Sequence, residues 1–367
     1  MAITNTSFAS RLTSLITSFS DADRLEYSKA IVSDIHVDNE IEKEKPVLYG
    51  FQDGDVVPII ENNDSYTMFP SADETVCSTS ECDIPLNFSG VKLTMALAKC
   101  RIPICLNSFN KDFLYFWGTY RKFNENPDLD EALLQFIGKQ FKQGLENAKW
   151  RRAYFADKLS TSNLLDKANG FFTQADAGAT AGVNEVTIAK NSGANYAAQI
   201  MTGQEVYELL SEMYDLASVN PWFDPATYQF EVTWQMANVF VNWLNNLGHK
   251  APANCSCYNA EGIVKSNVYT VDNVAFNGVR VIGRKAFDGV ISQVPELNGN
   301  NVAGAARTEP NRAILAKNEN MPVFSTDEEN LTFFDIWHSK DDEKIYMRGG
   351  TYIGAAIPEV NKIIYAH

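Results

Sequence analysis

The sequence contains 367 residues, of which 45% are hydrophobic, 12% aromatic and 21% charged. This composition is that of a folded globular protein, the length suffices for roughly two average domains, and disorder is excluded as the main state of the chain. Acidic residues outnumber basic ones by 46 to 31, which gives a net charge of −15. Tight binding of nucleic acid is not expected, because phosphate contacts require clustered lysine and arginine.

One basic group, Lys149 with Arg151 and Arg152, stands out in this acidic chain. We interpret it as the solvated face of a helix rather than as a nucleic-acid site. Residues 1–30 contain no basic leader followed by an apolar core, so no secretory signal is predicted. No stretch reaches the roughly 18 uninterrupted apolar residues of a membrane span, which predicts a soluble chain with an intracellular site of synthesis.

The first 40 residues carry one apolar stripe at helical spacing, on a segment otherwise rich in Ser, Thr and Asp. The stripe consists of Phe8, Leu12, Leu15, Ile16 and Phe19. It is too small to form a core of its own. It is therefore predicted to lie on the rest of the chain or on a neighbouring molecule.

The next stretch, residues 40–87, combines frequent proline with short β-prone runs such as Val47–Tyr49 and Val56–Val57. Its prolines are Pro46, Pro58, Pro70 and Pro85. Proline this frequent excludes helix, and the segment is too long and too apolar for a plain linker. A pair of extended strands with a projecting tip is predicted, a form that is marginal alone and needs a partner surface.

A helix of more than 30 residues is predicted over 127–159, with Asp128 as N-cap and Glu131 completing a capping box. Its apolar stripe runs in steps of about four residues: Leu129, Leu133, Ile137, Phe141, Leu145, Ala148, Phe155 and Leu159. Lys139, Lys142, Glu146 and Lys149 on the opposite side indicate a face that is either wetted or packed against polar groups. A rod about 45 Å long crosses a subunit from edge to edge. A long core helix of an enzyme is the alternative interpretation.

Two further helices and a series of strands follow. Thr202 and Glu205 form a capping box for the first helix, and a second, apolar nearly all round, is predicted from about Gln229 to Leu247, ended by Gly248. Asn277-Gly278 predicts a hairpin. Later strands are "RAILAK", "MPVFST", "LTFFDIW", "EKIYMR" and "KIIYA", with turns at 318–320, 327–330, 339–343 and Gly349-Gly350. Helices followed by strands predict an α+β fold.

The sequence offers little chemistry, and no catalytic, cofactor-binding or metal-binding residue is predicted. No phosphate loop, dinucleotide fingerprint, nucleophile elbow or zinc-protease motif occurs. Cys77, Cys82, Cys100, Cys105, Cys255 and Cys257 lack zinc spacing and are predicted to be free, mostly buried thiols, with Cys77 and Cys82 facing each other across a loop. His36, His249, His338 and His367 are scattered, and His338 is predicted at the surface near a strand end.

The acidic run Asp341-Asp342-Glu343, with Asp327 and Asp335, lacks the spacing of a calcium loop and is interpreted as a solvated turn. Paired carboxylates for glycoside hydrolysis stay open, because sequence does not show which acids face a cleft. A missing catalytic motif, a sticky arm, a projecting hairpin and an over-long rod together favour an assembly protein.

These parts, in this order, resemble the major capsid protein of tailed bacteriophages, which has the Hong Kong 97-like fold. Two stretches carry the likeness further. "NGFFTQ" (169–174) resembles the family's turn into its axial domain. "PNRAILAKNENMPVFSTD" (310–327), followed by "LTFFDIWHSKDDEKIYMRGGTYIGAAIPEV", resembles the return of the chain to the peripheral domain. The resemblance covers nearly the whole chain as an order of elements.

The resemblance implies five parts along the chain. They are an N-terminal arm (1–45), an extended β-hairpin loop (46–100), a peripheral domain with a long spine helix (101–160), an axial domain (161–330) and a C-terminal return to the peripheral domain (331–367). No removable N-terminal scaffolding domain is visible, since the arm is short. No Lys and Asn pair is identified for the covalent crosslinking that some members use.

The implied function is structural and non-enzymatic, without cofactors. The subunit self-assembles into hexamers and pentamers of an icosahedral head that encloses double-stranded DNA without binding it specifically, and the acidic balance suits such a container. A separate scaffolding protein, a portal and head-decoration proteins are the expected partners, with no membrane. The expected location is the virion, after synthesis in the host bacterial cytoplasm. Alternatives are a tail tube or sheath protein, or an acidic hydrolytic enzyme.

Overall fold

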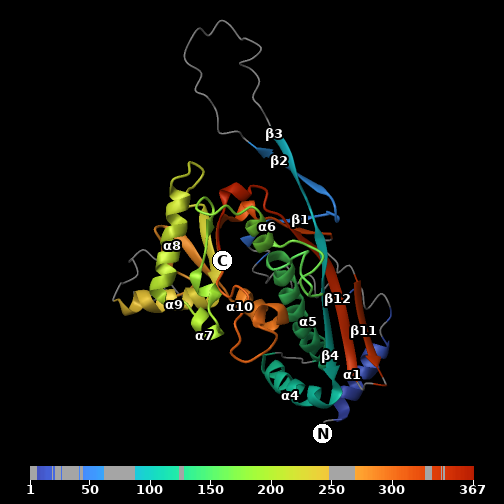
Figure 1. Ribbon diagram of the computed structural model, residues 1–367. Coiled ribbons are helices and arrows are strands. Elements are labelled where there is room, and N and C mark those ends of the chain that lie inside the picture. Colours follow the sequence, from blue (N-terminus) through green and yellow to red (C-terminus); the bar gives the residue numbers. More distant parts are fainter. Residues whose placement is uncertain are drawn as a thin grey trace, which may run out of the picture.

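A computed structural model of the chain describes residues 6–18, 20, 26, 41, 44–61, 87–123, 128–247, 269–326, 333–339, 341 and 344–367 (Figure 1). Several predicted features lie outside the described residues. They are the hairpin tip, the turn at 327–330, Phe19, His36, Cys77, Cys82, Gly248, His249, Cys255, Cys257, Asp342 and Glu343.

A five-stranded sheet forms the right side of the molecule in Figure 1. Its strands are β1 (Val47–Tyr49), β4 (Met95–Cys105), β10 (Val323–Ser325), β11 (Phe333–Ser339) and β12 (Lys344–Ala355). Strand β12 pairs with β4 along one edge and with β11 and then β10 along the other, always antiparallel. Strand β1 completes the sheet in parallel with β10, so the N-terminal region is tied to residues far along the chain.

A six-stranded mixed sheet forms the other half, in the order β5-β13-β9-β6-β8-β7. The strands are β5 (Glu185–Val186), β6 (Tyr228–Thr233), β7 (Ala275–Phe276), β8 (Val279–Arg284), β9 (Ala313–Lys317) and β13 (Ile364–Ala366). Helices α8 (Gly203–Ser218) and α9 (Trp234–Asn246) pack on it over a core that includes Phe230, Val232, Leu210 and Phe240. The C-terminal strand β13 thus lies in the sheet of the predicted axial range.

Helix α5 (Leu129–Tyr154) lies against β4 and β12, and its 26 residues make a rod roughly 39 Å long at about 1.5 Å per residue. Most members of the predicted apolar stripe are buried: Leu133, Ile137, Phe141, Leu145, Ala148 and Phe155. Helices α1 (Thr6–Ser18) and α4 (Leu106–Phe123) close the core at one end of the rod. The long helix is therefore confirmed in kind but not in its bounds.

The predicted helix was too long at both ends. It begins at Leu129, where the Asp128 carboxylate accepts from the amide of Asp130, and the predicted capping box with Glu131 is wrong because Glu131 instead accepts from Gln135. It ends at Tyr154, because the chain folds back and the amide of Gly170 donates to the carbonyl of Ala156 (2.7 Å). Leu159 lies beyond the helix and is 90% exposed.

The C-terminal half of α5 occupies the space between the two sheets, together with α6 (Phe171–Ala177) and α10 (Lys285–Gln293). The rings of Tyr154, Phe172 and Phe287 contact one another with centroids 4.8 to 5.6 Å apart. Short helices complete the fold: α7 (Tyr196–Gln199), α11 (Pro295–Asn298) and the 3₁₀ turns Ala189–Ser192, Asn318–Asn320 and Val360–Lys362. One continuous aromatic core therefore joins both sheets.

Three interpretations from the sequence are wrong. Residues 229–233 are strand, not helix: all of β6 is buried between β8 and β9, and α9 begins only after Thr233, whose hydroxyl caps it. Gly349 and Gly350 lie inside β12 rather than in a turn, since a Cβ on Gly350 would stand 2.7 Å from the carbonyl oxygen of Ala98. Lys149 and Arg152 are buried rather than solvated.

Other local predictions are confirmed. The hydroxyl of Thr202 and the carboxylate of Glu205 form the predicted capping box of α8. Asn277 and Gly278 both have positive φ and join β7 to β8, as a two-residue hairpin turn requires. Each of the predicted strand runs at 312–317, 321–326, 331–337, 343–348 and 362–366 coincides with an observed strand, although β11 and β12 extend beyond the predicted runs, to Ser339 and Ala355.

Gly144 of α5 provides a test of how closely the long helix packs on its sheet. A Cβ at this position would lie 2.3 Å from the sulfur of Cys100 on β4, so Gly144→Ala is expected to destabilise the protein by about 1–3 kcal/mol. Gly118→Ala in α4, where a Cβ meets nothing within 4 Å, is the matched control and should stabilise by about 0.5–1 kcal/mol. Urea unfolding measures both, and equal effects would contradict this packing.

Candidate assembly surfaces

A two-stranded hairpin projects from the body of the molecule (Figure 1). Strands β2 (Val56–Glu61) and β3 (Asn87–Lys92) pair antiparallel from Val56 opposite Lys92 to Glu61 opposite Asn87, and among the described residues neither joins another sheet. The predicted pair of extended strands is thus confirmed. A two-stranded ribbon is marginally stable alone, so this one gains stability if another surface covers it.

The root of the hairpin is fixed firmly to the body. The backbone amide of Gly54 donates to the carbonyl of Leu93, and the amide of Leu93 donates to the carbonyl of Asp55. The amide of Met95 donates to the side-chain carboxylate of Asp53. Phe51 packs edge-on against the buried ring of Phe324 on β10 (centroids 5.0 Å apart). These bonds extend the pairing of the two strands as far as the body, and the Phe51 contact packs the base of the hairpin on β10.

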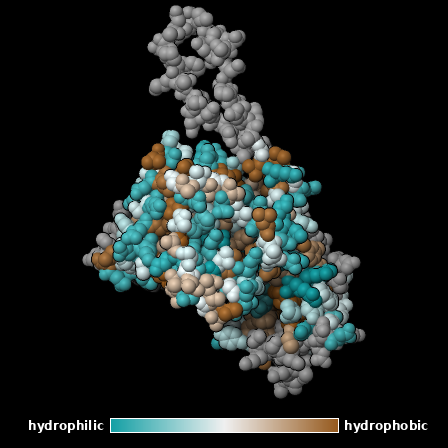
Figure 2. Space-filling view, viewed as in Figure 1, coloured by the Kyte–Doolittle hydropathy of each residue, from teal (hydrophilic) through white to brown (hydrophobic). Residues whose placement is uncertain are grey.

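Apolar side chains remain exposed at this root. Val56 on β2 is 59% exposed and Leu48 on β1 is 40% exposed. Figure 2 shows apolar atoms beside the root of the hairpin on a face that is otherwise mostly hydrophilic. Exposed apolar area next to a projecting ribbon is the kind of surface that a protein partner covers.

The N-terminal helix α1 lies on its own chain. Leu12 and Ile16 are fully buried against α4, α5 and β11, and Arg11 makes a bidentate ion pair with Asp130 at the start of α5 (2.6 and 3.0 Å). Leu15 is half-buried. The apolar stripe was predicted to lie either on the rest of the chain or on a neighbouring molecule. Leu12 and Ile16 lie on the rest of the chain.

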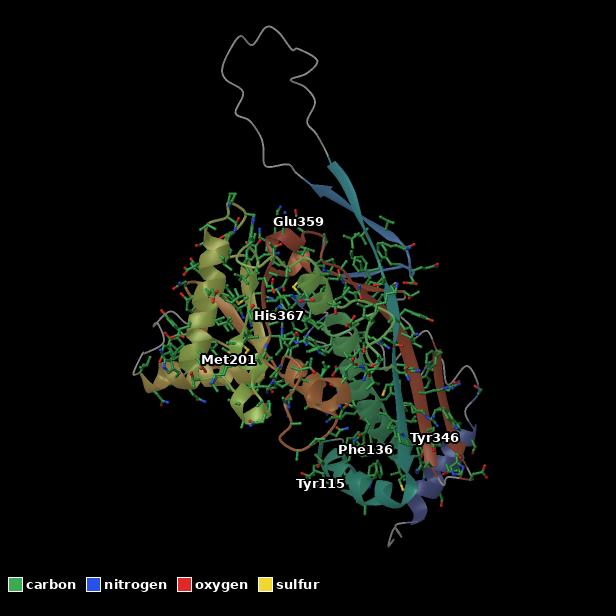
Figure 3. The ribbon with its side chains drawn as sticks, in the orientation of Figure 1. Tyr115, Phe136, Met201, Tyr346, Glu359 and His367 are labelled. Atoms are coloured by element: carbon green, nitrogen blue, oxygen red, sulfur yellow. The ribbon has the colours of Figure 1, made fainter. Side chains whose placement is uncertain are left out.

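Helix α4 carries an aromatic surface at the opposite end of the molecule from the hairpin (Figure 3). Phe113 is buried and packs against Phe116, Trp117 and Phe136, whereas Tyr115 is 82% exposed. The two ends of the molecule therefore both present apolar groups to solvent.

A buried ionic cluster ties the N-terminal segment to the body. The Glu231 carboxylate on β6 forms ion pairs with Lys45 (3.0 Å) and Arg284 (2.6 Å). It also accepts hydrogen bonds from the Tyr154 hydroxyl (2.8 Å) and the Gln229 side-chain amide (3.0 Å). Arg284 also pairs with Glu44, and Lys45 donates to Asn318 (2.7 Å). The side chains of Lys45 and Glu231 are each 1% exposed. Such a cluster fixes residues 44–45 against two distant strands.

Electrostatics keep this cluster charged. Burial alone would raise the pKa of Glu231, but the charges of Lys45 and Arg284, with hydrogen bonds from Arg284 and Tyr154, outweigh it and lower the pKa to about 2. Burial lowers the pKa of Lys45, which the Glu231 carboxylate opposes. Glu231 is therefore anionic at neutral pH. Sequence analysis missed the cluster, although one acid within the apolar run "YQFEVT" was an available signal.

The stretch "NGFFTQ" forms a joint between α5 and the end of β12. Phe171 and Phe172 are fully buried, and a Cβ on Gly170 would lie 2.6 Å from the backbone of Tyr154. The Gln174 amide donates to the carbonyls of Asn169 and Ala355 and accepts from the amide of Ile357. Residues from two distant regions are thus held together at this turn.

The structure brings together few of the candidates for chemistry. Cys100 is half-buried, which raises the pKa of its thiol to about 11, and Cys105 is exposed. Asp335 pairs with Arg348, and Asp341 lies in an exposed turn. His338 is half-buried near the end of β11. Within the described part of the chain, no group of acids, histidines and cysteines suits a metal ion, and no helix is long and apolar enough to cross a membrane.

No family model and no curated protein sequence matches the chain. Solved structures, in contrast, do match the chain. A chain of the satellite phage P4 procapsid that includes the size determination (Sid) protein matches 98% of this chain and 95% of its own length, with a TM-score of 0.50 and 12% identity. A chain from Gordonia phage Cozz has a TM-score of 0.48 at 12% identity, covering 89% of this chain and 85% of that one.

A virus-like particle from Pyrococcus furiosus matches with a TM-score of 0.43 at 12% identity, over 93% of this chain and 98% of that one. The procapsid match extends over nearly the full length of both chains. The chain therefore has a phage capsid fold of the α+β class, as the sequence predicted.

Proposed function

We propose that the chain is the major capsid protein of a phage head, a structural subunit that acts by self-assembly. The observation that carries the proposal is the match to a procapsid chain over nearly the whole length of both proteins. The firmly rooted hairpin supports it, because a marginal two-stranded ribbon with exposed apolar residues at its base is suited to lie on a neighbouring subunit. No catalytic role is proposed.

The proposed assembly consists of hexamers and pentamers in an icosahedral shell that encloses double-stranded DNA. Obligate assemblies commonly bury more than about 2,000 Å² per interface, and segments that reach beyond the body supply such area. A net charge of −15 favours a container that does not adhere to DNA. Scaffolding, portal and decoration proteins are proposed partners, and the virion is the proposed location. The five predicted domain ranges remain part of the proposal.

Negative-stain microscopy with mass determination tests this proposal. The purified protein is examined concentrated alone and again after co-expression with its neighbouring genes. Shells, or rings of six and five subunits, are expected. Tubes would favour a tail tube or sheath protein instead. A single monomeric species under both conditions would contradict self-assembly and direct attention to a hydrolytic role for the acidic residues.

A further inference from the structure

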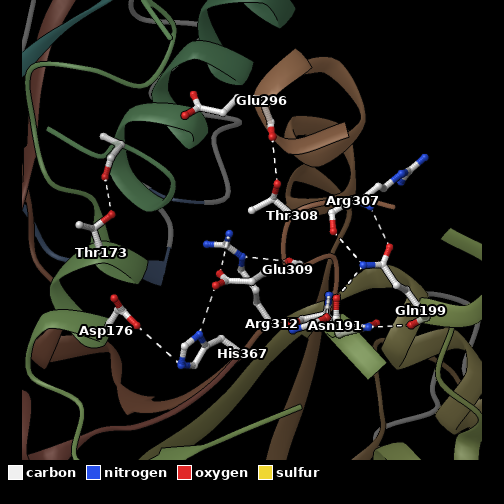
Figure 4. A network of polar contacts seen from close by, with 12 residues as sticks. Thr173, Asp176, Asn191, Gln199, Glu296, Arg307, Thr308, Glu309, Arg312 and His367 are labelled. Atoms are coloured by element: carbon white, nitrogen blue, oxygen red, sulfur yellow. Dashed lines mark hydrogen bonds and ion pairs between the residues drawn. The ribbon is translucent and has the colours of Figure 1, made fainter. Parts of the chain in front are cut away.

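His367 lies among three carboxylates that come from three different parts of the chain, and Figure 4 labels two of them, Asp176 and Glu309. Its Nε2 is 3.0 Å from Glu185 on β5 and 3.6 Å from Asp176 on α6, and its Nδ1 is 3.3 Å from Glu309. The ring stacks on Tyr365 with centroids 4.9 Å apart and an interplanar angle of 12°. Three acids therefore face one imidazole that cannot turn away freely.

The protonation state of the ring decides whether these contacts are bonds. An ionised carboxylate only accepts hydrogen bonds, and a neutral imidazole carries one N–H and one lone pair. Neutral His367 can therefore donate to Glu185 or to Glu309, but not to both. Only the imidazolium form donates at both nitrogens, and it also supplies a positive charge near all three acids.

The other charged group at this site already has a partner. Arg312 pairs with Glu309 (2.9 Å) and hydrogen-bonds the phenol of Tyr365. When His367 is neutral, Arg312 is therefore the one cation paired with these acids among the residues that the structure describes. Burial of the ring lowers the pKa of His367, but hydrogen bonds to Glu185 and Glu309 and the charges of Glu309 and Asp176 outweigh this and raise it overall.

The same residue lies where the edge strand β5 of the six-stranded sheet meets its neighbour β13. The backbone amide of Ile188 donates a hydrogen bond to the backbone oxygen of His367 (2.6 Å), and the backbone amide of His367 donates one to the carbonyl oxygen of Val186 (3.2 Å). Strand β5 has only two residues and pairs in parallel with β13. So short a strand depends on the side chains that hold it.

We propose that His367 is a proton-dependent latch: as the imidazolium it joins β5, α6 and the segment at Glu309 to strand β13, and its deprotonation loosens this edge of the sheet. This inference concerns the folded subunit alone and does not rest on the proposed function. Because the folded state binds the proton more tightly than the unfolded chain, the latch contributes its full stability below the ordinary histidine pKa of about 6.5. That contribution is lost as pH rises through the higher value of the folded protein.

NMR titration and hydrogen exchange of the full chain test the latch. The NMR signals of the His367 ring are identified by their absence from the spectrum of His367→Gln. The midpoint of their pH titration is expected above about 6.5. Over the same pH range, the amides of Ile188 and His367 should lose protection in the native protein, after correction for the intrinsic exchange rate. In His367→Gln this pH-dependent loss should be absent.

Two further variants separate the latch from a merely structural ring. Glu185→Gln removes one facing charge and should lower the titration midpoint of His367. His338→Gln on β11 is the matched control and should leave both the midpoint and the protection of Ile188 unchanged. A midpoint at or below the ordinary value, or protection at Ile188 that follows pH equally in His367→Gln, would overturn the proposal.

Discussion

Replacing Glu231 with alanine is expected to destabilise the subunit by about 3–5 kcal/mol, because the change leaves Lys45 and Arg284 buried without their shared counter-ion. The Tyr154 hydroxyl and the Gln229 amide lose their acceptor as well. Urea unfolding of the unassembled subunit measures the effect. Glu44→Ala is the matched control: Glu44 pairs with the same arginine but is partly exposed, so its loss should cost below about 1 kcal/mol.

Two additional results are expected if the charges cause the loss. The double variant Lys45→Met with Glu231→Ala should lose less free energy of unfolding than the two single variants lose together, because no unpaired lysine remains. The pKa of Glu231 is lowered to about 2, so its ionised carboxylate contributes its full stabilisation above the ordinary glutamate pKa of about 4.3. That contribution is lost as the pH falls toward about 2. Glu231→Ala should lack this part of the acid dependence. Strict additivity would contradict the buried pair.

Removing residues 62–86 is expected to abolish shell assembly while leaving the unfolding of the subunit unchanged. Glu61 and Asn87 are directly opposed in the β2–β3 ladder, so a two-residue Asn-Gly turn joins them without changing the register. The root contacts at Gly54, Leu93 and Phe51 are untouched by the deletion. Sedimentation and microscopy measure assembly, and thermal unfolding reports the fold.

A second variant tests what this segment contributes. It replaces residues 62–86 by a Gly and Ser linker of the same length, which preserves chain length but removes specific contacts. Loss of shells in both variants indicates that side chains of the segment contact a neighbour. Shells formed by the deletion variant at the native protein concentration would show that residues 62–86 are not required, and the part of the interlocking proposal that rests on them would then be wrong.

Local signals in the sequence predicted local structure well. The Asn277-Gly278 turn, the Thr202 and Glu205 capping box and the apolar stripe of α5 depend on residues within one or two turns of each other. The capsid fold itself was predicted from the order of such elements. What they do not contain is the identity of a partner distant along the chain, and each main error involves such a partner.

Gly350 illustrates this limit. A glycine pair is a common turn signal, yet here it allows β4 to approach β12, and that neighbour lies some 250 residues earlier. Strand β6 was mistaken for helix because Phe230 stands at helical spacing from Trp234 and Ala237; its pairing with β8 and β9 fixes it as strand. For the candidate surfaces, the hairpin was predicted, whereas the cluster at Glu231 and the acids around His367 depend on contacts that no spacing reveals.

The pairing of β12 has a consequence for how the chain is made. Strand β12 lies between β4 and the pair β10 and β11, and β13 separates β5 from β9, so both sheets are interrupted until residues 344–367 have been synthesised. Contacts this far apart in sequence form slowly, and the unfinished sheets expose strand edges in the meantime. A chain still on the ribosome therefore lacks both complete sheets, and their open edges close only when its last two strands have been added.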